Sequence, residues 1–560
     1  MPTAIDPSAS WKERSDAKKA SVLNGIPAEF LHPDLTHSET DRNPVLDIPS
    51  KFLSSKELSI TALDAVEVIS AIAQGTYTAV EVLDAFTHRA AIAHKLLNCC
   101  LEFRYQDARV EAEKQDRYFQ ETGKTVGPLH GLPISVKDQC RIIGTETTCG
   151  FVCNIGVPDT ETCDLVRILV NAGAVIFVKT SLSIGCLWGE TINNVIGRTS
   201  NPFNRSFSCG GSSGGEGALL GLHGSPLGVG TDLGGSIRSP SAYQGLWGLR
   251  PSSGRIPYYR MLNSMEGNEI VPSVVGPMSH SPHSLELFVK TVINSQPWLH
   301  DPHCQPIPWR ETVFTEIVEG KPLRIGSMLW DECAFPQPPI RRAIREIEAR
   351  LKAAGHEIVP WKIDQRTALE LLTNAMSCDA RDDVDRTMAL SGEPDLQLAF
   401  SPGRKPLTLL EAWDLTMKRT DFRALVMKRW NATATDDGRG PIDAYITPVN
   451  PSVCPMHEDY KRIRYLGYTG SVNLLDFTAC TIPVTFVDSQ IDLADQQDGR
   501  FDAMGLPIPP PVSELDKTIR ANYDPERFKG LPVAVQVVGR RLEEEKVLGI
   551  ARVLHKLLEP

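Results

Sequence analysis

The sequence lacks any long apolar run. None approaches the roughly 20 apolar residues that a membrane-spanning helix requires. Residues 9–19 are polar and charged, where a secretory signal would have its apolar core. We therefore expect no membrane partner for this chain.

Regular cysteine spacing is also absent. The 13 cysteines are odd in number and scattered, and Cys149 and Cys153 stand too far apart for a Cys-x-x-Cys motif. This usage is typical of reduced thiols rather than of a disulfide framework. We therefore expect a cytoplasmic protein.

An excess of basic residues is missing as well. The formal net charge is −11, whereas proteins that bind nucleic acid usually present a basic face, so we expect no nucleic-acid partner. His356-Glu357 begins like a zinc-protease helix, but the second histidine is absent. Gly123-Lys124 resembles the end of a P-loop, yet Tyr118 stands where the first glycine should be. We expect no metal and no cofactor.

Two glycine-rich loops carry serines. Ser212 and Ser213 lie within residues 210–217, and Ser236 lies within residues 231–238. Glycine lets the backbone turn sharply and brings N–H groups close to a ligand. A hydroxyl beside converging N–H groups suits acyl transfer, because the reaction needs a nucleophile and a site for the oxyanion.

A lysine that ends an apolar run supplies a candidate base. Lys137 directly follows residues 133–136, which we interpret as a strand. A lysine removes a proton only when it is neutral, and burial can lower its pKa by roughly 3–5 units from about 10.4. The alternative is an exposed lysine at a strand end that pairs with Asp138.

The first serine loop has other interpretations. A linker or a phosphate cradle could have this composition, but the apolar residues 218–222 follow at once and can open a buried helix. Residues 211–215 also match Gly-x-Ser-x-Gly around Ser213, the elbow of Ser-His-Asp hydrolases. In a run so rich in glycine and serine this match carries little weight, and we interpret His130 as an ordinary loop residue.

Taken together, these three segments resemble the amidase signature family of serine hydrolases, and the fungal acetamidases within it. The resemblance rests on Lys137, on Ser212 and Ser213 in their glycine loop, and on Ser236 in Thr-Asp-x-Gly-Gly-Ser-Ile-Arg. It implies that Ser236 is the nucleophile, that Ser212 is a bridging serine on a cis peptide, and that Lys137 is the base. It extends over nearly the whole chain.

Further site residues surround the serines. The N–H groups expected to form the oxyanion hole are those of Leu233, Gly234, Gly235 and Ser236. We expect Asp232 and Arg238 to hold this turn, and Ser213 to support Ser212 by a hydrogen bond. Cys186, with Ser212 and residues 233–236, is expected to contact the substrate. Cys186 lies in residues 183–190, which depart from the pattern expected of an acetamidase.

Strand-like and helix-like runs alternate from about residue 128 onward, which predicts an α/β fold. We expect a single large domain with a mixed, largely parallel sheet covered by helices on both faces. Residues 1–55 are predicted to form an N-terminal arm, and residues 56–560 the amidase domain, with a signature core at about 128–260. The family resemblance implies the same fold.

The predicted activity is hydrolysis of a carboxamide to a carboxylate plus ammonia or an amine, through a Ser-Ser-Lys triad and a covalent acyl-enzyme. One alternative is the transamidating subunit of a glutamine-dependent amidotransferase, which shares the signature. Another is an inactive module that holds an anion in the glycine loop. The expected partner is a small-molecule amide, and the choice between monomer and homodimer stays open.

Overall fold

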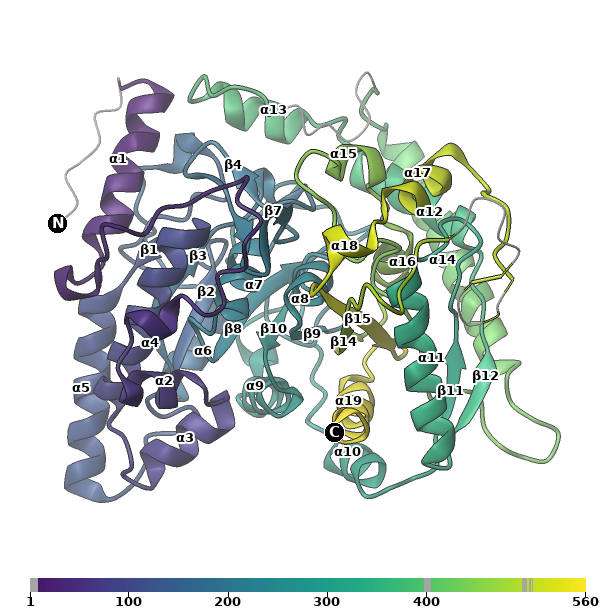
Figure 1. Ribbon diagram of the computed structural model, residues 1–560, viewed down its shortest axis with the longest axis horizontal. Helices are drawn as coiled ribbons and strands as arrows, with labels where there is room; N and C mark the ends of the chain where they lie inside the picture. Colours follow the sequence, from purple (N-terminus) through teal and green to yellow (C-terminus); the bar gives the residue numbers. More distant parts are fainter. Residues whose placement is uncertain (1–8, 397–403, 496–500, 503–504, 506, 560) are drawn as a thin grey trace.

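Within the described residues, one mixed sheet of 11 strands runs across the molecule (Figure 1). The computed structural model describes residues 9–396, 404–495, 501–502, 505 and 507–559. In spatial order the strands are β1 (Cys100–Phe103), β3 (Val175–Thr180), β2 (Pro133–Lys137), β8 (Leu227–Asp232), β10 (Val274–Ser279), β9 (Trp247–Arg250), β14 (Ala479–Phe486), β15 (Pro532–Val538), β13 (Ala444–Pro448), β11 (Arg324–Ser327) and β12 (Glu357–Pro360). Two small ribbons pair β4 (Ile192–Asn193) with β5 (Gly197–Arg198) and β6 (Ser200–Asn201) with β7 (Asn204–Ser208).

Strand direction divides the sheet into blocks. Strands β3, β2 and β8 are mutually parallel, and so are β13, β11 and β12. Between these blocks every neighbouring pair from β8 to β13 is antiparallel, and β1 is antiparallel to β3. The mixed sheet predicted from the sequence is confirmed, and its parallel part is confined to the two blocks.

Helices cover both faces of the sheet, as predicted. They are α1 (Trp11–Asn24), α2 (Ser55–Thr61), α3 (Ala65–Ala73), α4 (Ala79–Leu97), α5 (Tyr105–Thr122), α6 (Asp164–Asn171), α7 (Gly214–Gly221), α8 (Arg238–Gln244), α9 (Pro282–Asn294), α10 (Glu311–Val318), α11 (Pro338–Ala353), α12 (Gln365–Met376), α13 (Asp382–Ala389), α14 (Leu409–Asn431), α15 (Tyr460–Ile463), α16 (Gly467–Leu475), α17 (Glu514–Asn522), α18 (Pro525–Phe528) and α19 (Glu544–Leu558). Helices α7 and α8 pack together, as do α12 and α16, whereas α10 and α11 pack on α19.

Local sequence explains where the early helices begin. Helix α4 starts after Thr78, whose side chain and Glu81 form a capping box, as its sequence predicts. Helix α3 starts after Asp64, which pairs in the same way with Glu67. The sequence Thr61-Ala62-Leu63-Asp64 also suits a helix start at Thr61, but this residue ends α2 instead. Asp64 has the reciprocal partner three residues on, and this partner decides the start.

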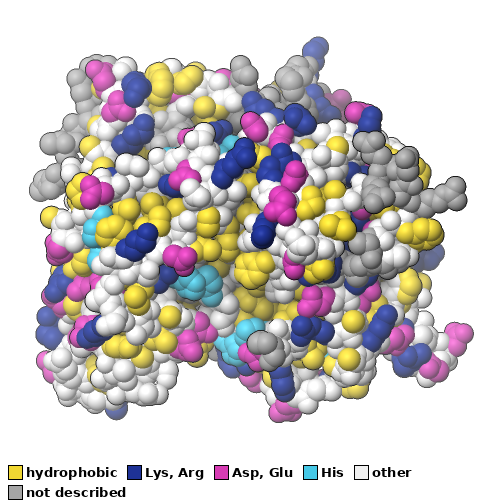
Figure 2. Space-filling view, in the orientation of Figure 1, with side chains coloured by type: hydrophobic (Ala, Val, Ile, Leu, Met, Phe, Trp, Pro, Cys, Tyr) yellow, Lys and Arg dark blue, Asp and Glu magenta, His cyan; other side chains and the backbone are white. Residues whose placement is uncertain are grey.

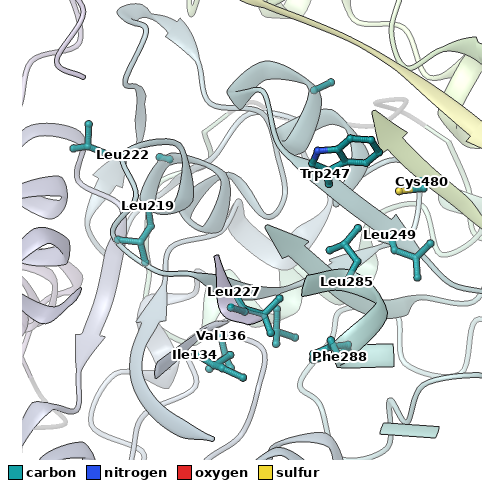
Figure 3. Packing of buried hydrophobic residues seen from close by; sticks show 14 of the residues in the cluster. Ile134, Val136, Leu219, Leu222, Leu227, Trp247, Leu249, Leu285, Phe288 and Cys480 are labelled. Atoms are coloured by element: carbon teal, nitrogen blue, oxygen red, sulfur yellow. The ribbon is translucent and has the colours of Figure 1, made fainter. Parts of the chain in front are cut away.

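The apolar core beneath the site fixes the strand that ends in Lys137. Ile134 and Val136 on β2 are fully buried and belong to one hydrophobic cluster with Leu219 and Leu222 from the α7 segment. Figure 3 shows Ile134 and Val136 next to Leu227 on β8. Burying aliphatic side chains of this size contributes roughly 1.5–3 kcal/mol each, so the position of β2 is strongly determined.

The surface in Figure 2 has Lys and Arg side chains interspersed with Asp and Glu. No helix among the described residues is long and apolar enough to cross a membrane. All 13 cysteines are free thiols. Helix α1 of the N-terminal segment packs on β1, so this part of the chain lies against the sheet.

His94 on α4 is a buried group that links the stability of the protein to pH. Its side chain is buried, and its Nδ1 accepts a hydrogen bond from the Cys100 N–H (3.2 Å). Burial, with smaller effects of His37 and Lys95, lowers the pKa of His94 to about 3. A histidine with a lowered pKa stabilises the fold above its unfolded-state pKa of about 6.5 and loses this contribution as the pH falls.

We therefore predict that the free energy of unfolding falls by ~2 kcal/mol on account of His94 between pH 7 and pH 5. His94→Asn keeps an acceptor at the δ position but cannot be protonated, so it should flatten this dependence. Urea unfolding at both pH values measures the difference. His303→Asn, at an exposed side chain, is the control. An unchanged pH dependence in His94→Asn would contradict the assignment.

Candidate active site

Three chain segments meet where β2 and β8 end. Strand β2 delivers Lys137, the turn before α7 carries Ser212, and the turn between β8 and α8 carries Ser236. Strands β2 and β8 are neighbours and parallel, with Ser135 opposite Gly228. The carboxyl ends of neighbouring parallel strands meet at one sheet edge, so the topology brings the predicted residues together.

Lys137 is completely buried and donates two short hydrogen bonds. Its Nζ lies 2.7 Å from Ser212 Oγ and 2.7 Å from Thr231 Oγ1. The Thr231 hydroxyl in turn donates to Gln139 Oε1, so its oxygen faces the lysine as an acceptor. Burial lowers the pKa of Lys137. The side chain is thus held on the serine, with its neutral form favoured relative to a lysine in water.

The alternative in which Lys137 pairs with Asp138 is wrong. Asp138 instead lies 3.4 Å from Lys179 Nζ, and both side chains are buried. Asp138 also accepts hydrogen bonds from the N–H groups of Thr148 and Cys149. The Asp138 carboxylate therefore interacts with Lys179 and with backbone N–H groups rather than with Lys137.

Glu216 lies on α7, which follows the Ser212 turn, and was not expected from the sequence. It is fully buried and accepts hydrogen bonds from Ser135 Oγ (2.7 Å) and Thr180 Oγ1 (2.9 Å). Burial raises the pKa of Glu216 to about 8, despite these hydrogen bonds. The carboxyl group is therefore largely neutral at pH 7, so it adds little negative charge near Lys137.

The peptide bond between Gly211 and Ser212 is cis, as the resemblance implies. A side chain at position 211 has no room, because a Cβ there would lie 2.7 Å from the Trp188 carbonyl oxygen. The glycine is therefore required where the loop passes close to residues 188–190.

Ser213 was predicted to hydrogen-bond to Ser212, but its hydroxyl has a different partner. Its Oγ exchanges hydrogen bonds with the backbone N–H and carbonyl of Thr231, each 3.2 Å long. Its own N–H donates to the Ser236 carbonyl (3.2 Å). Ser213 thus joins the two serine loops to each other, and its hydroxyl is buried and engaged. This placement argues against Ser213 as the nucleophile of an elbow.

The turn that carries Ser236 is organised by one carboxylate. Asp232 Oδ1 accepts a hydrogen bond from the Gly235 N–H (2.9 Å), and Oδ2 accepts one from the Ile237 N–H (3.1 Å). The Arg238 guanidinium binds both oxygens of Asp232, at 3.0 Å each. Burial raises the pKa of Asp232, but the charge and hydrogen bonds of Arg238 outweigh it and hold the pKa below its usual value. Asp232 and Arg238 therefore hold this turn.

Two residues from the C-terminal half complete this network. Arg238 Nη2 donates to Asn473 Oδ1 (2.6 Å), and Nη1 donates to Gln536 Oε1 (2.9 Å). Asn473 Nδ2 also donates to Asp232 Oδ1 (2.8 Å). Neither residue is assigned to the site by the sequence. Their amide types offered no local signal, because only the fold brings α16 and β15 to the turn.

One of the four expected oxyanion donors is already used. The Gly235 N–H points to Asp232, so the donors that remain as candidates are those of Leu233, Gly234 and Ser236. Gly235 has a φ of +122°, and a Cβ there would lie 2.6 Å from Thr469 Oγ1. Thr469 Oγ1 donates to the Gly234 carbonyl (2.7 Å) and so fixes the orientation of the Gly234–Gly235 peptide.

A cavity opens beside this turn. Its walls include residues 233–236 and Gly211 from the serine loops, Cys186 and Trp188 from the segment after β3, and residues 463–466. Cys186 Sγ also lies 3.8 Å from Cys149 Sγ. No histidine occurs among the described residues of this lining. The described part of the chain has no group of three or more His, Cys, Asp or Glu side chains suited to a metal ion.

Comparison with known proteins assigns the chain to a family. The model of the family described as Amidase matches residues 81–548. The chain is 41% identical to the acetamidase of Emericella nidulans over 98% of both chains, and 40% identical to the acetamidase of Aspergillus oryzae over 99% of both. A solved structure titled fatty acid amide hydrolase superposes with a TM-score of 0.90 at 33% identity, covering 99% of this chain and 96% of that one. This chain therefore belongs to the amidase family of hydrolases that act on amide bonds.

Proposed function

We propose that this amidase cleaves a carboxamide through an acyl-enzyme, with Ser236 as nucleophile, Ser212 as proton relay and Lys137 as base. The observation that carries the proposal is the 2.7 Å hydrogen bond between Lys137 Nζ and Ser212 Oγ in a fully buried site. Burial favours the neutral amine, which is the form able to accept a proton.

In the proposed first half-reaction, Ser236 Oγ attacks the amide carbonyl carbon. Its proton passes to Ser212 Oγ, while the Ser212 proton passes to neutral Lys137. A hydroxyl can donate and accept at once, so Ser212 can serve both steps. The N–H groups of Leu233, Gly234 and Ser236 would stabilise the oxyanion, because the network of Asp232 and Arg238 fixes the turn in advance.

Later in the same half-reaction, the relay returns a proton to the leaving nitrogen. An amine leaves poorly unless it is protonated, so collapse of the tetrahedral intermediate requires this step. The C–N bond breaks, ammonia or an amine departs, and Ser236 carries the acyl group. Water, deprotonated through Ser212, then releases the carboxylate and restores the serine.

Small and medium carboxamides are the proposed substrate class. Relatives named acetamidase support a small acyl group, and the structural neighbour named fatty acid amide hydrolase supports a larger one. Leu187 and Trp188 bring bulky apolar surface to the cavity. A panel of primary amides of graded acyl length, assayed by ammonia release, would define the preference.

The nucleophile is tested by Ser236→Ala. We expect kcat/KM for an amide to fall at least about 10³-fold, because no other hydroxyl occupies this position. Ser59→Ala, at an exposed serine on α2, is the matched control. Circular dichroism and thermal melting should match those of the wild type. Near-normal ammonia release by the folded variant would rule out Ser236 as the nucleophile.

The base is tested through the pH profile. The neutral form of Lys137 is active and burial lowers its pKa, so kcat/KM should rise with pH and reach its midpoint below the usual value of about 10.4. Lys137→Ala should lose about 10²–10⁴-fold and should lack this limb. A wild-type rate that is flat from pH 5 to 9, with chemistry shown to be rate-limiting, would count against a titrating lysine.

The relay is tested by comparing an amide with an ester of the same acyl group. Ser212→Ala should reduce amide hydrolysis at least about 10-fold more than ester hydrolysis, because a phenolate or alkoxide needs less protonation to leave. A common acyl group cancels the contacts of the cavity in the ratio of kcat/KM values. Equal losses would leave Ser212 as a positioning residue only.

A further inference from the structure

Two cysteine thiols meet at the wall of the catalytic cavity. Cys186 is the one cysteine among the described residues that line this cavity, and the same lining includes Ser236. The Cys186 Sγ lies 3.8 Å from the Sγ of Cys149, which is buried and lies outside that lining. An oxidant that enters the cavity therefore meets Cys186 first and finds a second thiol directly beside it.

The backbone holds the two thiols next to each other. The Gly185 N–H donates a hydrogen bond to the Cys149 carbonyl (2.9 Å), and the Cys149 N–H donates to Asp138 Oδ2 (2.9 Å). Both cysteines have a left-handed backbone, with φ of 49° at Cys149 and 60° at Cys186. Residues other than glycine seldom adopt this conformation, and those that do are concentrated at functional sites. The pairing is therefore fixed by the chain and does not depend on a chance contact of mobile side chains.

The separation of the two sulfurs suits formation of a disulfide. A disulfide places the sulfurs about 2.05 Å apart, so they must approach by about 1.8 Å. Burial raises the pKa of the Cys186 thiol, but its hydrogen bond with Cys149 and the charge of protonated Lys137 lower this pKa below its ordinary value. The thiolate is the form that attacks an oxidant, so Cys186 is the thiol of the pair that reacts first.

The segment that carries Cys186 also supports the turn at Ser212. The Ser183 N–H donates to the Ser212 carbonyl (3.4 Å), and the Cys186 N–H donates to the Ser183 carbonyl (2.9 Å). Gly211 passes so close to this segment that a Cβ there would lie 2.7 Å from the Trp188 carbonyl oxygen. A movement of Cys186 toward its partner thiol would therefore displace residues on which the Ser212 turn rests.

We propose that Cys149 and Cys186 form a redox site at which a peroxide reversibly inactivates this amidase. The Cys186 thiolate attacks one peroxide oxygen, the O–O bond breaks, and the departing oxygen takes up a proton, which leaves a sulfenic acid on Cys186. The Cys149 sulfur then attacks the Cys186 sulfur, and the sulfenic oxygen departs as water with the Cys149 proton. The peroxide has accepted two electrons, and a dithiol returns them when it reduces the disulfide. The effect on activity rests on the proposed function, because both require Ser212 to be correctly placed.

The test measures the bond and the activity separately. Wild-type protein is treated with hydrogen peroxide, which catalase then removes, and its remaining thiols are blocked with N-ethylmaleimide under denaturing conditions. We expect mass spectrometry of the digest to show two peptides joined through Cys149 and Cys186. In the native sample kcat/KM for a primary amide should fall about 10–100-fold, since displacement of a catalytic group by about 1 Å has effects of this size. Dithiothreitol should restore the activity and separate the peptides.

Variants assign the effect to this pair. Cys149→Ala should keep the untreated activity but form no disulfide, so dimedone should label Cys186 and excess peroxide should inactivate beyond rescue by dithiothreitol. Cys149→Ser serves as a second variant should alanine disturb folding. Cys186→Ala should lose both the disulfide and the dimedone label. Cys153→Ala is the matched control, because Cys153 is four residues from Cys149 and more exposed, and it should behave like the wild type.

Two outcomes would overturn the inference. One is the absence of the joined peptides at a peroxide dose that inactivates the wild type. The other is a disulfide that forms and leaves kcat/KM unchanged. The proposed function is decided separately by the variants of Ser236, Ser212 and Lys137. Unimpaired turnover in Ser236→Ala would refute that mechanism, whereas the joined peptides and the loss of activity would still establish the redox site.

Discussion

The structure depends above all on keeping one lysine in a buried position. Lys137 gives up its water shell, and the hydroxyls of Ser212 and Thr231 replace only part of it. Each unit by which its pKa is lowered costs about 1.4 kcal/mol, so the surrounding fold must supply that energy. The apolar residues of β2 and the neutral carboxyl of Glu216 both favour the neutral amine of Lys137, because neither offers its ammonium form a compensating negative charge.

Much of this arrangement could be predicted from the sequence, because its signals are local. The apolar run before Lys137 predicts a strand, and glycines beside Ser212 and Ser236 predict tight turns. The contributions of Asn473 and Gln536 could not be predicted in this way, since an amide side chain gains its role only from what the fold places beside it. The engaged Gly235 N–H was missed for the same reason: the sequence does not show which acceptor a backbone donor finds.

Strand direction shows a second limit. Alternating apolar and helical runs indicate an α/β sheet, but they do not say which strands become neighbours. Strands β9 and β10 follow each other closely and pair antiparallel, while β14 and β15 enter the middle of the sheet from the end of the chain. The parallel blocks lie where a helix connects successive strands, which is the situation that the sequence pattern describes.

The position of β15 has a consequence for how the protein is made. This strand contains Gln536, which binds Arg238, and it lies in the sheet between β14 and β13, although Gln536 comes 298 residues after Arg238 in the sequence. During synthesis the signature loops leave the ribosome long before residues 532–538 exist. The turn at Ser236 therefore acquires its final support only after residues 532–538 have been made, so a shorter nascent chain carries the proposed catalytic side chains without the finished site.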